Sequence, residues 1–137
     1  MNYNRHNSTK ALIILPQVYY YQMPLCRIGI AEIDGEITDI FFADRAADYP
    51  GELRETPLIK EASRQLQEFF ALTRQVFDLP LHPHGTAFQR QVWRALCDIP
   101  YGQTRSYQEI ARAINKEKAC RAVGQANNRN PIAIVIP

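Results

Sequence analysis

The first half of the chain alternates apolar and polar positions in the way that is typical of strands. Between Leu25 and Phe42, β-branched and aromatic residues flank Asp34-Gly35, a pair that readily adopts the positive φ values of a tight turn. This pattern predicts a hairpin. Residues 11–21 are also rich in β-branched and aromatic side chains and predict one or two further strands. We therefore expect a small sheet in this part of the chain.

The apolar spacing changes to a helical period after the predicted sheet. Thr56-Pro57 resembles a helix start, because a threonine can cap the free amides and a proline is preorganised for the first turn. The apolar face that follows consists of Ala62, Leu66, Phe69 and Phe70. Residues 79–85 contain prolines and histidines that break this pattern, and they are predicted to link two lobes, residues 1–80 and residues 85–137.

A second helix is predicted from Thr86, where Gln89 three residues later completes a capping box. Its predicted buried stripe consists of Phe88, Val92, Ala95, Leu96 and Ile99. Pro100 and Gly102 end this helix.

Two short helices with a tight break between them are predicted next. Ser106 and Glu109 indicate another capping box at the start of the first, and the second is expected to run from about Glu117 to Asn127. Two short helices in this arrangement are typical of a helix-turn-helix. The second lobe is therefore predicted to be helical, and the chain as a whole to have a mixed α/β (α+β) fold.

The last predicted helix is unusual in its small side chains. These are Ala119, Ala122, Gly124 and Ala126, and Arg121 stands among them. Small side chains let a helix backbone approach a neighbour closely, and that neighbour is either a groove of DNA or the core of the lobe itself. Periodicity alone favours neither interpretation.

An unbroken apolar run, residues 132–136, follows Asn130-Pro131. Such a run predicts a strand that is buried on both faces. Because termini are normally polar and exposed, a sequence that stops after a core strand is interpreted as cut short, or as completed by another chain.

The charge is unevenly distributed along the chain. Residues 1–84 contain 8 Lys or Arg and 11 Asp or Glu, a net charge of −3, whereas residues 85–137 contain 8 and 3, a net charge of +5. This asymmetry suggests that the second lobe faces a polyanion, although an uneven solvated surface is the alternative.

Composition excludes several classes of protein. With 46% hydrophobic and 22% charged residues the chain is ordinary for a soluble globular protein, and its apolar runs are far shorter than the roughly 18 residues of a membrane span. The three cysteines are too few for a disulfide framework or a CxxC metal site, which favours a reducing, cytoplasmic setting. His82 and His84 are interpreted as loop residues, since no third metal ligand lies nearby in the sequence.

Several ordered blocks of the second lobe resemble the methylated-DNA-protein-cysteine methyltransferases. The blocks are residues 85–93, 99–104, 106–107, 121–124, 130–131 and 134–137. The resemblance is specific over residues 85–137 and looser over residues 25–80. It implies direct repair, in which an alkylated guanine is flipped out of double-stranded DNA and its alkyl group passes irreversibly to a protein cysteine. The damaged DNA is itself the donor, so no cofactor is implied, and the protein is expected to act as a monomer.

The resemblance also implies roles for individual residues. Arg121 matches the arginine that fills the vacancy left by the flipped base, and Ala122 and Gly124 belong to the same DNA-binding helix. Tyr107 matches the tyrosine that crowds the phosphate of the target nucleotide, and Asn130 matches the asparagine of the turn before the active-site strand. The alternatives are a solvated charge for Arg121, a core aromatic for Tyr107 and a simple turn former for Asn130.

In the family the Ile-Pro pair is followed by Cys-His-Arg, which contains the nucleophile and its base. The sequence ends at Pro137, and none of Cys26, Cys97 and Cys120 precedes His-Arg. We therefore expect an incomplete alkyltransferase with no catalytic residue before Pro137. A non-catalytic lesion-binding protein of the same fold and a plain helix-turn-helix protein are the alternatives.

Overall fold

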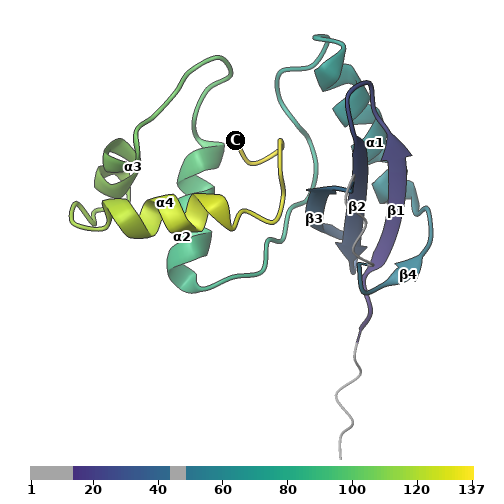
Figure 1. The fold of residues 1–137 in the computed structure, drawn as a ribbon, viewed down its shortest axis with the longest axis horizontal. Helices are drawn as coiled ribbons and strands as arrows, with labels where there is room; N and C mark the ends of the chain where they lie inside the picture. Colours follow the sequence, from purple (N-terminus) through teal and green to yellow (C-terminus); the bar gives the residue numbers. More distant parts are fainter. Residues whose placement is uncertain (1–13, 44–48) are drawn as a thin grey trace, which may run out of the picture.

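The computed structural model describes residues 14–43 and 49–137, in which a four-stranded sheet is followed by four helices (Figure 1). The strands and helices are β1 (Gln17–Gln22), β2 (Arg27–Ile33), β3 (Glu36–Phe42), β4 (Glu52–Leu53), α1 (Pro57–Phe70), α2 (Ala87–Cys97), α3 (Tyr107–Ala113) and α4 (Cys120–Asn128). The sheet and α1 lie on one side, and α2, α3 and α4 lie on the other. The predicted α+β fold, with a helix-turn-helix in the second lobe, is confirmed.

The sheet has the strand order β3-β2-β1-β4. The predicted hairpin joins β2 to β3 through Asp34 and Gly35, whose φ angles of 50° and 78° match a two-residue turn that requires positive φ at both positions. β1 pairs antiparallel with β2 and confirms one of the strands expected in residues 11–21, of which residues 11–13 lie outside the described part of the chain. The pattern did not predict β4, two exposed residues that run parallel to β1.

α1 begins where the sequence predicts. The Thr56 hydroxyl accepts a hydrogen bond from the Ile59 amide at 3.1 Å, and Pro57 occupies the first helical position. Ala62 and Leu66 are fully buried beneath the sheet, whereas the two phenylalanines of the last turn are only half-buried. The predicted apolar face is therefore the face that packs on the sheet.

The two lobes meet at the outer edge of β3. On one side, the Ile37 amide donates to the Pro80 carbonyl and the His82 amide donates to the Ile37 carbonyl, both at 2.8 Å. Three residues further along the strand, the Ile40 amide donates to the Pro131 carbonyl and the Ile40 carbonyl accepts from the Ala133 amide, both at 2.9 Å. The segment that enters the helical lobe and the segment that follows α4 thus both cover the same strand edge (Figure 1).

One continuous set of buried side chains runs through both lobes. It includes Ile30 and Ile40 of the sheet, Leu66 of α1, Trp93 of α2 and Val123 of α4. The lobes therefore share a core, which places the helices at a fixed position relative to the sheet.

α2 begins with both halves of the predicted capping box. The Gln89 amide donates to the Thr86 hydroxyl at 3.1 Å, and the Thr86 amide donates to the Gln89 side chain at 2.9 Å. Val92 and Leu96 of the predicted stripe are buried. Trp93, which the predicted stripe omits, is also buried, and its indole donates to the Ala126 carbonyl at 2.8 Å.

Two details of the helix-turn-helix differ from the prediction. The Ser106 hydroxyl caps the Glu109 amide at 3.1 Å, but the Glu109 carboxylate lies 4.0 Å from Arg105, so the structure shows the hydroxyl half of that capping box. α4 begins at Cys120 rather than near Glu117, because residues 117–118 form a turn in which the Ala119 amide donates to Lys116 at 2.9 Å.

The predicted C-terminal strand is wrong. Ile132 forms only an isolated bridge with Ile40, and the chain then turns, with the Ile136 amide donating to the Ile132 carbonyl at 3.1 Å. Ile134 has a φ of 72° within this turn. Ile132 and Ile136 are nevertheless buried, so burial was predicted correctly and the backbone conformation was not.

Candidate DNA interface

α4 presents one continuous exposed stripe. Its members, called the α4 outer stripe below, are Arg121, Ala122, Gln125, Asn128 and Arg129, the last being the C-cap residue. The spacing of i, i+1, i+4, i+7 and i+8 is that of one helix face. Val123, Gly124 and Ala126 form the opposite, buried face. The helix is therefore held by the lobe along one side and offers the other side to a partner.

The α4 outer stripe has the polar and cationic chemistry that DNA requires. Neither Arg121 nor Arg129 forms an ion pair with any other residue in the described part of the chain, so both guanidinium groups are available to phosphates or base edges. Sequence reasoning missed Gln125, Asn128 and Arg129. Helical spacing counted from Arg121 would have found them.

Tyr107 stands at the first position of α3 and projects toward α4. Its side chain is partly exposed, with 44% of the residue surface accessible. The ring lies on Gly124, where an added Cβ would come within 3.0 Å of the Tyr107 ring. The Tyr107 hydroxyl accepts a hydrogen bond from the Asn127 side-chain amide at 3.4 Å. Tyr107 is thus placed beside the α4 outer stripe rather than in the core.

The small residues of α4 lie on both sides of the helix. Gly124 and Ala126 face inward, where Gly124 admits the Tyr107 ring and the Ala126 carbonyl accepts from Trp93. Ala122 faces outward next to Arg121. Close packing within the lobe therefore explains two of the small residues, and Ala122 keeps the exposed surface flat beside Arg121.

Asn130 holds the turn that follows α4. Its side-chain oxygen accepts from the Ile132 amide at 2.9 Å, and its side-chain amide donates to the Ile136 carbonyl at 2.8 Å. These two bonds span residues 130–136 and fix the end of the Ile-Val-Ile-Pro run. Asn130 is therefore more than a simple turn former before proline.

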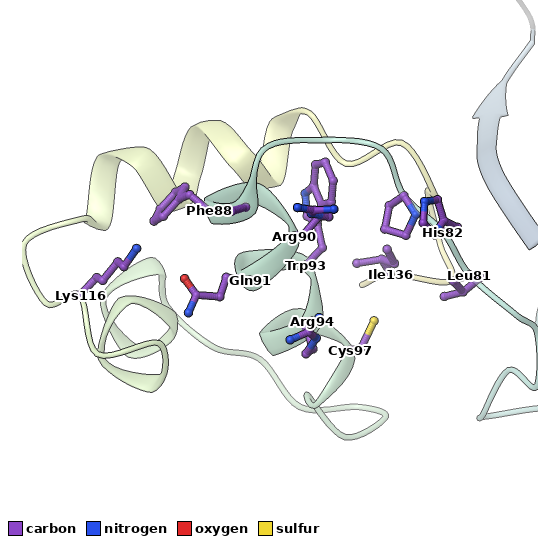
Figure 2. Close-up of a pocket in the computed structure, with 12 residues that line it drawn as sticks. Leu81, His82, Phe88, Arg90, Gln91, Trp93, Arg94, Cys97, Lys116 and Ile136 are labelled. Atoms are coloured by element: carbon purple, nitrogen blue, oxygen red, sulfur yellow. The ribbon is translucent and has the colours of Figure 1, made fainter. Parts of the chain in front are cut away.

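A pocket of about 640 Å³ lies along the outer face of α2. Figure 2 shows Arg90, Gln91, Arg94 and Cys97 following one another along this helix, with Ile136 facing them. Phe88 and Trp93 contribute apolar surface, and Lys116 lies over the Phe88 ring, with its nitrogen 5.3 Å from the ring centre. The lining contains cations and apolar groups, and the Asn130-held turn forms one of its walls.

The three cysteines lie in different parts of the fold. Burial, and to a lesser extent the charge of Asp98, raises the pKa of the Cys97 thiol, which disfavours the reactive thiolate. Cys26 lies in the sheet lobe, away from α4, and Cys120 opens α4 without a histidine beside it in the sequence.

The histidines and acidic side chains of the described residues are dispersed. Within residues 14–43 and 49–137, no three His, Cys, Asp or Glu side chains are grouped closely enough to hold a metal ion. The rings of His82 and His84 contact one another with centres 5.0 Å apart, and His82 lies 3.8 Å from the Glu36 carboxylate. In the same ranges, no helix has both the length and the apolar character that a bilayer-spanning segment needs.

Comparison with known proteins identifies relatives of the whole arrangement. Residues 87–137 match the family model described as the DNA-binding domain of 6-O-methylguanine DNA methyltransferase. A methylated-DNA–protein-cysteine methyltransferase of Methanosarcina barkeri is 62% identical over 78 residues, which are 57% of this chain and 49% of that protein. The chain thus matches about half the length of this relative.

Other relatives are covered more fully. The constitutive methylated-DNA–protein-cysteine methyltransferase of Bacillus subtilis is 46% identical over 122 residues, which are 85% of this chain and 74% of that protein. The structure of Mycobacterium tuberculosis OGT in complex with DNA superposes with a TM-score of 0.80 at 36% identity, covering 88% of this chain and 74% of that one. These similarities extend through both lobes, and the chain therefore belongs to the methylated-DNA–protein-cysteine methyltransferase family.

Proposed function

We propose that this chain binds double-stranded DNA through the α4 outer stripe and recognises alkylated guanine in direct DNA repair. The observation that carries the proposal is the arrangement of Arg121 and Tyr107 on the exposed side of a helix-turn-helix. Tyr107 packs on Gly124, which lies one helical turn after Arg121. A relative of known structure, the OGT of Mycobacterium tuberculosis, has been seen in complex with DNA.

Each part of this arrangement has a role in exposing a damaged base. A stacked guanine cannot present its alkylated oxygen to a protein group, so the nucleotide must leave the duplex, at a cost of a few kcal/mol. Arg121 is exposed and has no ion-pair partner among the described residues, and its side chain is long enough to fill the space left in the base stack. Tyr107 is proposed to contact the phosphate of the extruded nucleotide. Ala122 leaves room for the helix to approach the groove.

The net charge of +5 in residues 85–137 supplies the non-specific part of the binding energy. Contacts between cations and phosphates release counterions, so the affinity should fall steeply as the salt concentration rises. A chain whose two lobes have opposite net charges should also orient its helical lobe toward DNA before contact.

The proposal is tested by titrating two labelled duplexes, one plain and one carrying O6-methylguanine, at two salt concentrations. The wild-type chain should bind both with steep salt dependence and should prefer the alkylated duplex. Arg121→Ala should lose affinity for the alkylated duplex more than for the plain one.

Arg54→Ala serves as the matched control, because it removes the same charge from an exposed position in the sheet lobe. It should leave the preference between the duplexes unchanged. Salt-independent binding by a folded sample would contradict the DNA assignment, and equal losses on both duplexes would reduce Arg121 to a phosphate contact.

The alkyl transfer itself is proposed from the family. The acceptor expected there is a cysteine that follows the Ile-Pro pair, and Ile136-Pro137 matches that pair. Transfer forms a thioether, which is a poor leaving group, so each molecule is expected to accept one alkyl group. We further propose that the chain acts as a monomer in the cytoplasm; sedimentation of the free and DNA-bound chain and fractionation of cells test these two points.

A further inference from the structure

A hydrogen bond joins the side chains of Tyr107 on α3 and Asn127 on α4. The Asn127 side-chain amide donates to the Tyr107 hydroxyl oxygen at 3.4 Å. Gly124, one turn earlier on α4, supports the Tyr107 ring from below. Asn127 is half-buried, between the α4 outer stripe and the buried face of the helix, so it reaches Tyr107 without occupying the exposed surface.

The chemistry of the two groups sets the direction of the hydroxyl proton. A phenol hydroxyl can both donate and accept, whereas the NH₂ group of an asparagine can only donate. When Asn127 donates, the Tyr107 oxygen is the acceptor, and its proton must point elsewhere. No carbonyl or carboxylate in the described part of the chain takes this proton, since the bond from Asn127 is the hydrogen bond that the hydroxyl makes there. The proton is therefore left free on the partly exposed side of Tyr107.

We propose that Asn127 is a positioning residue that orients the Tyr107 hydroxyl as a donor toward an acceptor oxygen of the target nucleotide. The inference rests on the proposed DNA-binding function and names a residue that determines its selectivity. Asn127 does not itself need to touch DNA, because it acts through Tyr107.

The first test examines the hydrogen bond without DNA. In the folded chain, the Asn127 side-chain NH₂ resonances should move toward the values of a free amide when Tyr107→Phe removes the acceptor. The Asn128 side-chain resonances, from the neighbouring exposed amide, should not move comparably. Unchanged Asn127 resonances in the folded variant would overturn the proposal, because there would be no bond to orient the hydroxyl.

The second test reverses the polarity of the contact. Asn127→Asp keeps the shape of the side chain but replaces the amide donor with a carboxylate. The carboxylate accepts the hydrogen bond from the Tyr107 hydroxyl, which then cannot donate to the DNA. The added negative charge is matched by Asn128→Asp, one position along the same helix. Asn127→Asp should lower affinity for the O6-methylguanine duplex by roughly fivefold more than Asn128→Asp does, which is the size of one net hydrogen bond.

A double-mutant cycle separates this effect from charge and folding. In a Tyr107→Phe background the hydroxyl is absent, so Asn127→Asp should weaken binding no more than Asn128→Asp does. Melting curves of each variant verify that the chain is folded.

Equal losses from Asn127→Asp in the presence and absence of the hydroxyl would overturn the positioning role. A wild-type chain that binds both duplexes equally would contradict the proposed lesion recognition instead. In that case the cycle measured on the plain duplex, together with the amide resonances, still decides whether Asn127 directs the hydroxyl.

Discussion

Gly124 affects both the stability of α4 and the position of the Tyr107 ring. A substitution at Gly124 is expected to change these two properties in different directions. Alanine is favoured over glycine inside a helix by about 1 kcal/mol, but its Cβ would lie only 3.0 Å from the Tyr107 ring. The ring is partly exposed and can move outward. We therefore expect Gly124→Ala to keep or slightly raise the melting temperature while weakening duplex binding severalfold.

The matched comparison for this prediction uses a chain without the ring. In a Tyr107→Ala background, Gly124→Ala should no longer change DNA affinity, although its effect on the melting temperature should remain. If the binding loss persisted without Tyr107, the contact between Gly124 and the ring would not be its cause.

The three cysteines allow a prediction about chemistry. Because burial raises the pKa of the Cys97 thiol, and because Cys26 and Cys120 lack a neighbouring His-Arg, we expect none of them to accept an alkyl group. A polypeptide of residues 1–137 incubated with an O6-methylguanine duplex should show no added alkyl mass in intact-protein mass spectrometry. A polypeptide that continues with Cys-His-Arg after Pro137 should gain one alkyl group per molecule.

Stoichiometric alkylation mapped to Cys26, Cys97 or Cys120 would contradict this assignment. A plain helix-turn-helix protein would show no preference for the alkylated duplex in either form, and a non-catalytic lesion-binding protein would show the preference without the mass change.

Single residues differ in how well the sequence predicts them. The exposure of Arg121 follows from its place in a helical pattern, because each side chain on a short amphipathic helix has a definite face. Trp93 was missed although it lies between Val92 and Leu96 on the same buried face of α2. Its hydrogen bond to Ala126, 33 residues away, is a contact that no local pattern encodes. The contact between Asn127 and Tyr107 could not be predicted for the same reason.

The turn over residues 130–136, which stands where a strand was predicted, is held by the side chain of Asn130. Asn130→Ala removes the two side-chain bonds that hold the Ile132 amide and the Ile136 carbonyl. Leaving such partly buried groups unpaired costs about 1–3 kcal/mol each at most, so we expect a loss of about 2 kcal/mol in the free energy of unfolding, measured by urea titration. Hydrogen exchange of the amides in residues 132–136 should also increase.

Asn130→Asp provides the comparison, because it keeps the acceptor for the Ile132 amide and loses the donor to Ile136. It should lie between the wild type and Asn130→Ala. If both variants were as stable as the wild type, the turn would be held by the buried side chains of Ile132 and Ile136 alone.

Elements whose ends are set by neighbouring residues were predicted well. The Asp34-Gly35 turn and the caps at Thr56 and Thr86 act within three residues of the backbone groups that they satisfy. The run at residues 132–136 was misread because an apolar run shows that a segment is buried but does not fix its backbone conformation. β4 is too short to carry a pattern, and it forms because β1 offers a free edge.

The whole molecule should lose stability at alkaline pH. The Tyr21 hydroxyl donates to the Glu55 carboxylate at 2.6 Å, which ties β1 to the segment before α1. Burial, followed by the bond to Glu55 and its charge, raises the pKa of Tyr21 above its ordinary value of about 10. Burial and Asp39 raise the pKa of Tyr49 in the same direction.

These raised pKa values make the free energy of unfolding depend on pH. The folded chain holds the protonated tyrosine more tightly than the unfolded chain does, so the stabilisation is complete below pH 10 and is lost as the pH rises above that value. Chemical unfolding at a series of pH values should show this decline in the wild type and a shallower decline in Tyr21→Phe. The double variant Tyr21→Phe, Tyr49→Phe should show a still smaller loss of stability with pH. If stability fell equally with pH in the wild type and in Tyr21→Phe, the bond between Tyr21 and Glu55 would not be the cause.

The covered edge of β3 limits how the chain can be divided. The sequence predicts a linker at residues 79–85, which invites the expression of each half as an independent module. In the folded chain, however, the outward-facing amides and carbonyls of Ile37 and Ile40 are paired, as far as the described residues show, by the linker and by the segment that follows α4. A sheet lobe produced alone would therefore expose an unpaired strand edge, the kind of surface on which a second molecule adds a strand and aggregation begins. In the full chain, the two segments that flank the helices cover this edge and so oppose self-association of the sheet.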